Sequence, residues 1–258
     1  IPTMENAIFA RGLQAFQEEL HTRGYTLLVS SSAYDPKLEE EQIRALVSRG
    51  ADGLLLIGYD RDPEVYQFLE RQNTPVLIAW VFSKDSPLTT IGFDNCASMR
   101  ELTQHVIDFG HRKIGVISGI TKGNDRAAQR LQGIHEATAS SKQNPAVVGV
   151  IETTYEVESG GDAFESLMQS DVRPTVVICG NDVLAVGALR RAHDLGLRVP
   201  SRLDIPLAKL PVCALKLAIG DGDRVRDEEG RSRPRHGGLP LRRPGGPRGL
   251  HRDLGPRP

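Results

Sequence analysis

Residues 113–151 read KIGVISGITKGNDRAAQRLQGIHEATASSKQNPAVVGVI, and this stretch decides the fold. An apolar run at Lys113–Ser118 is followed by a segment of helical spacing at Asp125–Ala137 and by a second apolar run at Ala146–Ile151. Both runs are continuous rather than alternating, which is typical of strands buried on both faces. A strand, a helix and a second strand at this spacing predict parallel strands joined by a right-handed crossover.

The same pattern recurs on both sides of this unit. Further strands are predicted at Tyr25–Ser30, Gly53–Gly58, Pro75–Trp80 and Thr175–Cys179. Further helices are predicted at Ile8–Leu20, Pro36–Val47, Asp62–Arg71, Ala97–Phe109, Ser159–Met168 and Val183–Leu195. Several helices stop at a glycine, as helix C-caps often do: Gly24, Gly50, Gly110 and Gly196. The chain is therefore predicted to be an α/β protein with doubly wound parallel sheets, whose ligands bind beyond the carboxyl ends of the strands.

The composition limits the class of protein. The 258 residues carry 32 Lys+Arg against 33 Asp+Glu and are 39% hydrophobic, which is typical of a soluble globular protein. We find no apolar run of membrane-spanning length and no secretory signal pattern at the N-terminus. The three cysteines lie far apart without CxxC spacing, which excludes a disulfide framework and a cysteine zinc site. These features favour a cytoplasmic location.

The near-zero net charge hides two opposed segments. Residues 1–200 carry 19 Lys+Arg and 26 Asp+Glu, whereas residues 201–258 carry 13 and 7. The last 38 residues include 10 Arg, 8 Gly and 6 Pro, and no Lys, Ile, Phe, Tyr or Trp. Such a segment buries too little apolar surface to offset the entropy of ordering it. Two interpretations of the tail at 201–258 stay open: a frameshifted reading of a GC-rich gene, and a genuine disordered basic tail.

The motifs of common enzymes are absent. The sequence contains no HExxH, GxxxxGK[ST], GxSxG or GxGxxG, and its seven histidines do not pair at metal-ligand spacing. Acidic pairs fall on helix faces that are expected to be exposed to solvent. We therefore expect a binding protein rather than an enzyme, with no metal and no cofactor.

Eight short motifs together resemble one family. They are Pro2–Ala10 (PTMENAIFA), Gly50–Gly58 (GADGLLLIG), Pro75–Trp80, Ile91–Asn95 (IGFDN), Gly110–Ile114 (GHRKI), Arg130–Gly133 (RLQG), Pro174–Gly187 and Gly196–Pro200 (GLRVP). In this order and spacing, residues 1–200 resemble the effector-binding domain of LacI/GalR-family bacterial transcription repressors. The resemblance implies a two-lobed, periplasmic-binding-protein-like (type I) fold, with lobes at 1–110 and 111–200 and a ligand cleft between them.

The resemblance also implies a function. Such a domain senses a small sugar-like effector in the cleft and controls transcription allosterically, as part of a cytoplasmic homodimer. Operator DNA is bound in this family through a helix-turn-helix headpiece, which we expect this chain to lack. A periplasmic sugar-binding protein of a transport system is an alternative, although the GHRKI stretch is typical of the repressors. An α/β enzyme is a third hypothesis, for which we find no nucleophile or base.

Three residues are the leading candidates for ligand contacts. A sugar offers hydroxyl groups and an apolar ring face, so its site needs planar polar side chains and an aromatic platform. The resemblance assigns hydroxyl binding to Arg130 and an amide contact to Asn181, and Trp80 follows a predicted strand where its ring could stack on the ligand. An alternative stays open for each residue. Arg130 could lie on the helix surface, Asn181 could be a helix N-cap, and Trp80 could lie in an interface.

Four further residues complete the candidate ligand-binding set. Ile8 and Phe9 begin the first predicted helix at the mouth of the cleft, although Phe9 also fits the apolar core. Asp94 matches the family's Asp-Asn turn, where a structural role competes with ligand binding. Arg126 shares a loop with Arg130 and is expected to reach the cleft. The family's acidic ligand residue falls in the altered tail, which predicts poor effector binding.

Overall fold

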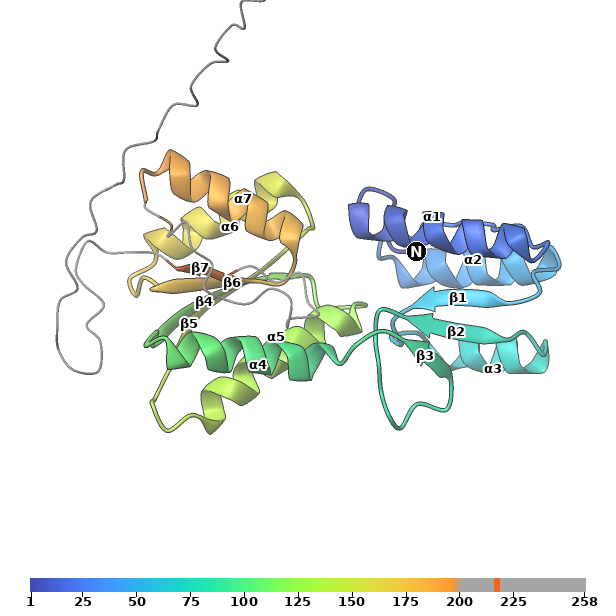
Figure 1. Cartoon of the computed structure of the whole chain (residues 1–258), viewed down its shortest axis with the longest axis horizontal. Coiled ribbons are helices and arrows are strands. Elements are labelled where there is room, and N and C mark those ends of the chain that lie inside the picture. The colour runs from blue at the N-terminus through green and yellow to red at the C-terminus, as the bar shows by residue number, and fades with distance from the viewer. Residues whose placement is uncertain (198, 200–215, 219–258) are drawn as a thin grey trace, which may run out of the picture. The chain divides into compact units, whose positions relative to one another are not determined.

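The computed structural model describes residues 1–197, 199 and 216–218, which all belong to one compact unit, Ile1–Asp221 (Figure 1). Two α/β halves within this unit each contain one sheet. The two interpretations of the tail at 201–258 lie outside the described residues, apart from the short strand at 216–218. The α/β class predicted from the sequence is confirmed.

The first sheet has three parallel strands in the order β1-β2-β3. The strands are β1 (Leu54–Ile57), β2 (Val76–Ala79) and β3 (Thr89–Ile91), and the helices are α1 (Ala7–Thr22), α2 (Pro36–Ser48) and α3 (Pro63–Arg71). Side chains alternate between the faces of a strand. Leu54 and Leu56 therefore share a core cluster with Ile43 of α2 and Leu69 of α3, whereas Ile57 lies with α1 on the other face.

The second sheet has four strands in the order β5-β4-β6-β7. They are β4 (Lys113–Gly119), β5 (Ala146–Thr153), β6 (Val176–Cys179) and β7 (Lys216–Ala218), of which only β7 is antiparallel to its neighbour. The helices are α4 (Asn95–Asp108), α5 (Asp125–Ser140), α6 (Val157–Gln169) and α7 (Asp182–Asp194). Figure 1 shows α6 and α7 on one face of this sheet and α4 and α5 on the other, which is the predicted doubly wound arrangement.

Helix α4 contributes to the core of the second sheet. Its side chains Met99, Leu102 and Val106 are fully buried in a cluster with Ile114 of β4 and Ile178 of β6. The lobe division predicted at residue 110 places this helix with the first lobe by sequence, and that division stays a prediction. The packing shows that α4 leaves the first sheet at its N-terminal end and covers the second.

Local sequence accounts for where the helices begin and end. In six of the seven helices between residues 7 and 194, the N-cap side chain accepts a hydrogen bond from a backbone N–H of the first turn: Asn6, Asp35, Asp62, Asp94, Asn124 and Asn181. These side chains satisfy donors that would otherwise lack a partner. The four glycines predicted as C-caps all have a left-handed backbone, with φ between 69° and 94°. The four predicted glycine C-caps are thus confirmed.

One predicted strand is absent, and one observed strand lies outside the predictions. Tyr25–Ser30, although rich in β-branched and apolar residues, forms no strand. A strand needs a hydrogen-bonded neighbour along its length, and this segment has one only at its carboxyl end, where Ile1 donates to the Ser30 carbonyl oxygen at 2.8 Å. Conversely, the sequence analysis does not predict β3 at Thr89–Ile91, because a three-residue segment is too short to show a periodicity.

Glycines allow α6 and α7 to pack closely. A Cβ atom added at Gly187 of α7 would overlap the carbonyl oxygen of Val157 and lie 2.9 Å from the backbone nitrogen of Gly161. We expect Gly187→Ala to lower the free energy of unfolding by about 1–3 kcal/mol through this overlap. Intrinsic helix propensity alone predicts the opposite sign, a gain of about 1 kcal/mol.

Urea denaturation of the wild type and of Gly187→Ala measures the sign. The matched control is Val186→Ala at the adjacent position, whose side chain is 49% exposed and whose replacement should leave stability almost unchanged. An increase in stability for Gly187→Ala would show that the two helices do not pack as the structure has them.

Candidate functional site

The carboxyl end of β1 leads into a tightly held turn, and Arg61 fixes it. The Arg61 guanidinium donates to the carbonyl oxygens of Ile57, at 3.0 Å, and of Gly58. It also forms an ion pair with Glu39 of α2 at 2.8 Å, and the Arg61 side chain is only 3% exposed. Gly58 has φ +75°, a conformation that favours glycine. A buried arginine thus fixes the turn at the carboxyl end of β1, which is where ligands of parallel sheets are expected to bind.

The N-terminus of α5 contacts this turn. Arg126 donates from Nη1 to the Ile57 carbonyl oxygen at 3.0 Å and pairs with Asp125 at 2.8 Å. The Asp125 carboxylate in turn accepts a hydrogen bond from the Tyr59 backbone N–H. A Cβ atom at Gly58 would overlap Arg126 and Asp125, so only glycine permits this approach. Arg126, predicted to reach a cleft between the two halves, therefore lies buried against the first sheet.

Arg130, one turn further along α5, joins three chain segments. Its Nε donates to Oδ1 of Asn95 at 3.0 Å, and its Nη1 donates to the carbonyl oxygen of Gly180, directly after β6. The fully buried Asn95 donates from Nδ2 to the Trp80 carbonyl oxygen at 3.2 Å, directly after β2. One guanidinium thus links the strand ends of the two sheets through the start of α4. This geometry differs from a side chain lying on the helix surface.

Asn181 and Asp94 each serve as a helix N-cap. Oδ1 of Asn181 accepts from the Leu184 backbone N–H at 2.9 Å, and the residue is only 8% exposed. Oδ1 of Asp94 accepts from the Ala97 backbone N–H at 2.9 Å, and the residue is exposed. The structural alternative considered for each residue is therefore realised in this structure. Asn181 nevertheless directly follows Gly180, so it lies beside the Arg130 contact.

The aromatic candidates pack on each other. The rings of Phe9 and Trp80 are 5.1 Å apart at 61°, an edge-to-face contact, and Phe9 is 5% exposed. Trp80 has φ +62°, unusual for a bulky residue, and a Cβ atom at Gly12 would lie 2.9 Å from its ring. Ile8 is exposed and takes part in none of these contacts. Of the two candidates in α1, Phe9 thus contacts Trp80, whereas Ile8 does not.

Sequence reasoning missed a second aromatic pair. The rings of Tyr34 and Tyr155 are 5.6 Å apart, and Asn124 donates from Nδ2 to the Tyr155 hydroxyl at 3.1 Å. Burial raises the pKa of Tyr34, so its hydroxyl stays neutral and available as a hydrogen-bond donor. Tyr155 lies two residues after the end of β5, so the rule that sites lie at carboxyl strand ends could have found it. A small cavity of about 20 Å³ beside Tyr34 and Arg126 is polar and about large enough for one water molecule.

These contacts define the strand-end cluster: Ile57–Tyr59, Trp80, Asn95, Asp125, Arg126, Arg130 and Gly180. The cluster contains the planar guanidinium donors of Arg126 and Arg130, the carbonyl acceptors that they contact, and the aromatic residue Trp80, which is linked to Arg130 through Asn95. Within the described residues, no group of three or more His, Cys, Asp or Glu side chains could hold a metal ion, and no helix could span a bilayer. The chemistry gathered here is that of reversible hydrogen bonding to a polar ligand.

Comparison with known proteins identifies a matching family and similar curated proteins. Residues 1–214 match the family described as periplasmic binding proteins and sugar binding domain of LacI family. HTH-type transcriptional repressor PurR of Klebsiella pneumoniae (strain 342) is 31% identical over 207 residues, which are 78% of this chain and 59% of that protein. The chain therefore spans about three fifths of the length of the curated relatives that it matches.

Solved structures show the same architecture. The transcription regulator GntR from Chromobacterium violaceum has a TM-score of 0.70 at 26% identity, and a LacI family transcriptional regulator from Silicibacter pomeroyi has 0.69 at 25%. Each comparison covers 78% of this chain and 74% of the other. The proteins named in these comparisons are transcription regulators rather than enzymes.

Proposed function

Because this chain belongs to the family of periplasmic binding proteins and LacI-type sugar-binding domains, we propose that it is the ligand-sensing domain of a transcriptional regulator. It binds a small sugar-like effector at the strand-end cluster and controls transcription allosterically. The observation that carries this proposal is the Arg130 guanidinium, which contacts Asn95 and Gly180 and so joins the ends of strands from two sheets.

The arginines of the cluster can donate hydrogen bonds to the hydroxyl oxygens of a ligand. Arg130 donates to two neutral acceptors, the Gly180 carbonyl oxygen and the Asn95 side-chain amide oxygen. Arg126 donates to one neutral acceptor, the Ile57 carbonyl oxygen, besides its ion pair with Asp125. Sugar hydroxyl oxygens are acceptors of the same kind, and a guanidinium holds two of them at once in a fixed plane. An effector can therefore replace internal acceptors without leaving a buried donor unpaired, which would cost about 1–3 kcal/mol.

The proposed mechanism follows from this exchange. An effector held by residues of both lobes, which we place at 1–110 and 111–200, stabilises one lobe arrangement over another. Only a difference in affinity between the two arrangements shifts their populations. In a homodimer this shift changes how two DNA-binding headpieces fit an operator. The headpieces, the operator and the cytoplasmic location belong to the proposal for the whole regulator.

The alternative of a transport binding protein has less support. The curated relatives named above are transcriptional repressors, and the similar solved structures are regulators. No enzymatic activity is proposed, since the cluster offers no side chain poised as a nucleophile beside a base.

Arg130→Ala tests the site. A panel of sugars and sugar phosphates, screened by thermal shift on the unaltered chain, first identifies a stabilising effector, and calorimetry then measures its affinity. We expect Arg130→Ala to weaken binding by about 1–3 kcal/mol, roughly five- to 150-fold, through loss of a charged hydrogen-bond donor. Arg173→Ala, at an exposed position before β6, is the matched control and should bind as the wild type does.

Two results would contradict the proposal. Unchanged affinity of Arg130→Ala would remove that residue from the site. A panel in which no sugar or sugar phosphate raises the melting temperature would argue against a sugar-like effector for this chain.

A further inference from the structure

The start of α5, in the half that contains the second sheet, is bonded directly to the half that contains the first sheet. Asp125 accepts a hydrogen bond from the Tyr59 backbone N–H, and Arg126 donates to the Ile57 carbonyl oxygen at 3.0 Å. The two side chains pair with each other at 2.8 Å, and Asp125 is 13% and Arg126 8% exposed. We call these contacts the latch, because protein groups alone join the two halves there.

The latch lies away from the covalent connection between the halves. Within residues 1–197 the chain passes from the first sheet to the second once, between β3 and α4. Strands β1 and β3 are at opposite edges of the three-stranded sheet, about 10 Å apart at the usual spacing between neighbouring strands. Contacts at the end of β1 therefore restrain a rotation of the halves about the connection between β3 and α4, which that connection alone does not prevent.

The space enclosed beside the latch is too small for a sugar. The cavity of about 20 Å³ is lined by Ile57, by Arg126 and by Tyr34, whose ring packs on the Tyr155 ring of the other half. Pockets that hold small molecules usually have about 300–1,000 Å³. A sugar that accepts a hydrogen bond from Arg126 therefore has to separate the halves at this point and replace the Ile57 carbonyl oxygen.

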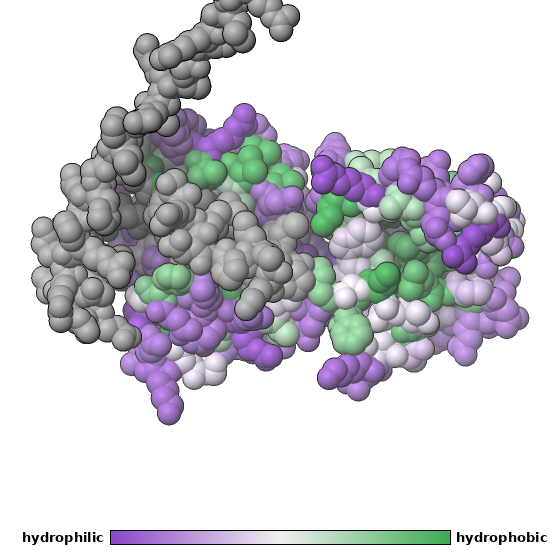
Figure 2. All heavy atoms as spheres, viewed as in Figure 1, coloured by the Kyte–Doolittle hydropathy of each residue, from purple (hydrophilic) through white to green (hydrophobic). Residues whose placement is uncertain are grey.

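Opening the latch releases polar groups and leaves the apolar cores intact. Water can replace each partner of Asp125 and Arg126, so the exchange of hydrogen bonds has a small net free energy. Figure 2 shows hydrophilic side chains, in purple, over much of the described part of the face that it draws, and the released pair would join a surface of the same kind. The contacts can therefore break and form again without unfolding either half.

We propose that Asp125 and Arg126 latch the two halves together over the effector site and that this latch opens before an effector binds. The inference rests on the proposed function, since it concerns admission to the same site. A protein whose binding-competent arrangement is only partly populated binds its ligand more weakly by that fraction. The latch thus sets the effector concentration at which the regulator responds.

Gly58→Ala tests the latch from the first half. A Cβ atom at Gly58 would overlap Nη1 of Arg126 and Oδ1 of Asp125. Both atoms are the ends of flexible side chains, so they can move away, and the latch bonds then break. Gly50→Ala is the matched control, because Gly50 has φ +83° against +75° at Gly58 and its added Cβ would have no atom within 4 Å. Both variants carry the strain of a left-handed alanine, and only Gly58→Ala disturbs the latch.

Asp125→Ala tests the latch from the second half. Asp125 and Asp182 are each the first residue of a helix, and each carboxylate accepts from the backbone N–H of the next residue. Alanine at either position therefore removes the same negative charge from a helix N-terminus. Asp182 is exposed, so Asp182→Ala is the control that leaves the latch in place.

Hydrogen exchange and small-angle X-ray scattering of the full chain measure the latch without an effector. The Tyr59 amide donates to Asp125, so we expect its exchange to be at least about tenfold faster in Gly58→Ala and in Asp125→Ala than in the wild type. Both variants should also have a larger radius of gyration. The two control variants should match the wild type in both measurements, and all five chains share residues 201–258, so a difference reports on the halves.

Equal exchange at Tyr59 in Gly58→Ala and Gly50→Ala would overturn the latch. Faster exchange with an unchanged radius of gyration would overturn it as well, because the bond to Asp125 would then be a local one that does not hold the halves. Since neither measurement uses an effector, a failure of the sugar panel counts against the proposed function and not against these contacts.

A binding measurement tests the competition between the latch and the effector. The probe is the compound of the panel that raises the melting temperature most. We expect Gly58→Ala to bind it at least about threefold more tightly than Gly50→Ala, because a larger fraction of the chain is already open. Equal or weaker binding by Gly58→Ala would contradict the proposal, whereas the effect of Arg130→Ala on the same compound tests the site itself.

Discussion

Replacing Arg61 with methionine is expected to lower the free energy of unfolding by about 3–5 kcal/mol, because it leaves a buried charge without its partner. Glu39, with a side chain 19% exposed, would lose its ion pair. The carbonyl oxygens of Ile57 and Gly58 would lose a donor at the same time. Methionine fills much of the same volume, so the missing charge and hydrogen bonds dominate the effect.

The matched control is Arg44→Met. Arg44 pairs with Glu40 one turn away, and both side chains are more than a third exposed. Exposed pairs of this kind contribute about 0–1 kcal/mol. Urea denaturation of the two variants should therefore separate them clearly. Equal stability losses would show that Arg61 is not buried against the β1 turn.

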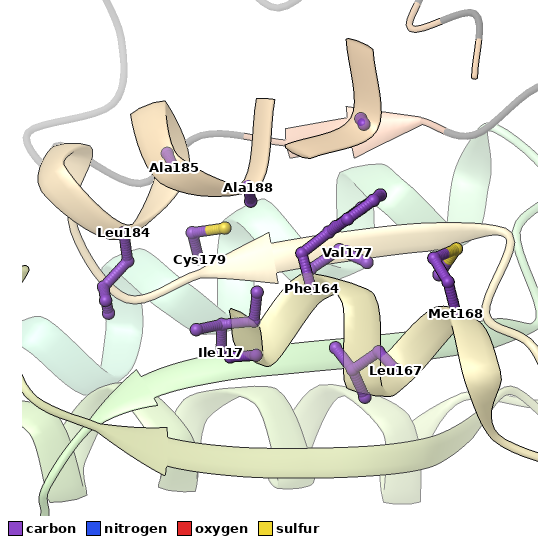
Figure 3. Close-up of a cluster of buried hydrophobic side chains, with 11 residues drawn as sticks. Ile117, Phe164, Leu167, Met168, Val177, Cys179, Leu184, Ala185 and Ala188 are labelled. Atoms are coloured by element: carbon purple, nitrogen blue, oxygen red, sulfur yellow. The ribbon is translucent and has the colours of Figure 1, made fainter. Parts of the chain in front are cut away.

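Replacing Phe164 with alanine is expected to destabilise the second sheet's half by a similar amount, about 3–5 kcal/mol. Phe164 of α6 is fully buried among Ile117 of β4, Val177 of β6 and Ala188 of α7, as Figure 3 shows. Its removal leaves a cavity that these helices and strands cannot fill without moving. Phe82→Ala, at a residue 42% exposed, should change stability by less than about 1 kcal/mol and serves as the control in thermal unfolding. A small loss for Phe164→Ala would mean that this core is loosely packed.

Most of the fold could be predicted from local sequence. Asn and Asp at the N-caps and glycine at the C-caps satisfy backbone groups within one turn of the helix, so sequence alone places the helix ends. Continuous apolar runs such as Lys113–Ser118 predict buried strands, since both faces of the sheet are covered. The Tyr25–Ser30 prediction is wrong because the propensity of its residues favours a strand, whereas a strand also needs a hydrogen-bonded neighbour, which residue propensity does not supply.

The site was less accessible to sequence reasoning than the fold. The family resemblance selected Arg126 and Arg130, and both belong to the strand-end cluster. Two of their partners are the backbone carbonyl groups of Ile57 and Gly180, and the type of a residue does not reveal that its carbonyl group lies at the end of a strand. Asn181 has the same sequence signature as a cap and as a ligand-binding amide, and only packing distinguishes the two. The ligand roles themselves stay predictions.

The structure of the chain with its effector, determined by crystallography, tests the central proposal most directly. We expect the ligand's hydroxyl groups to accept hydrogen bonds from Arg130 and Arg126, with groups from the strand ends of both sheets in contact with it. An effector bound elsewhere, or held by residues of one sheet alone, would contradict the account.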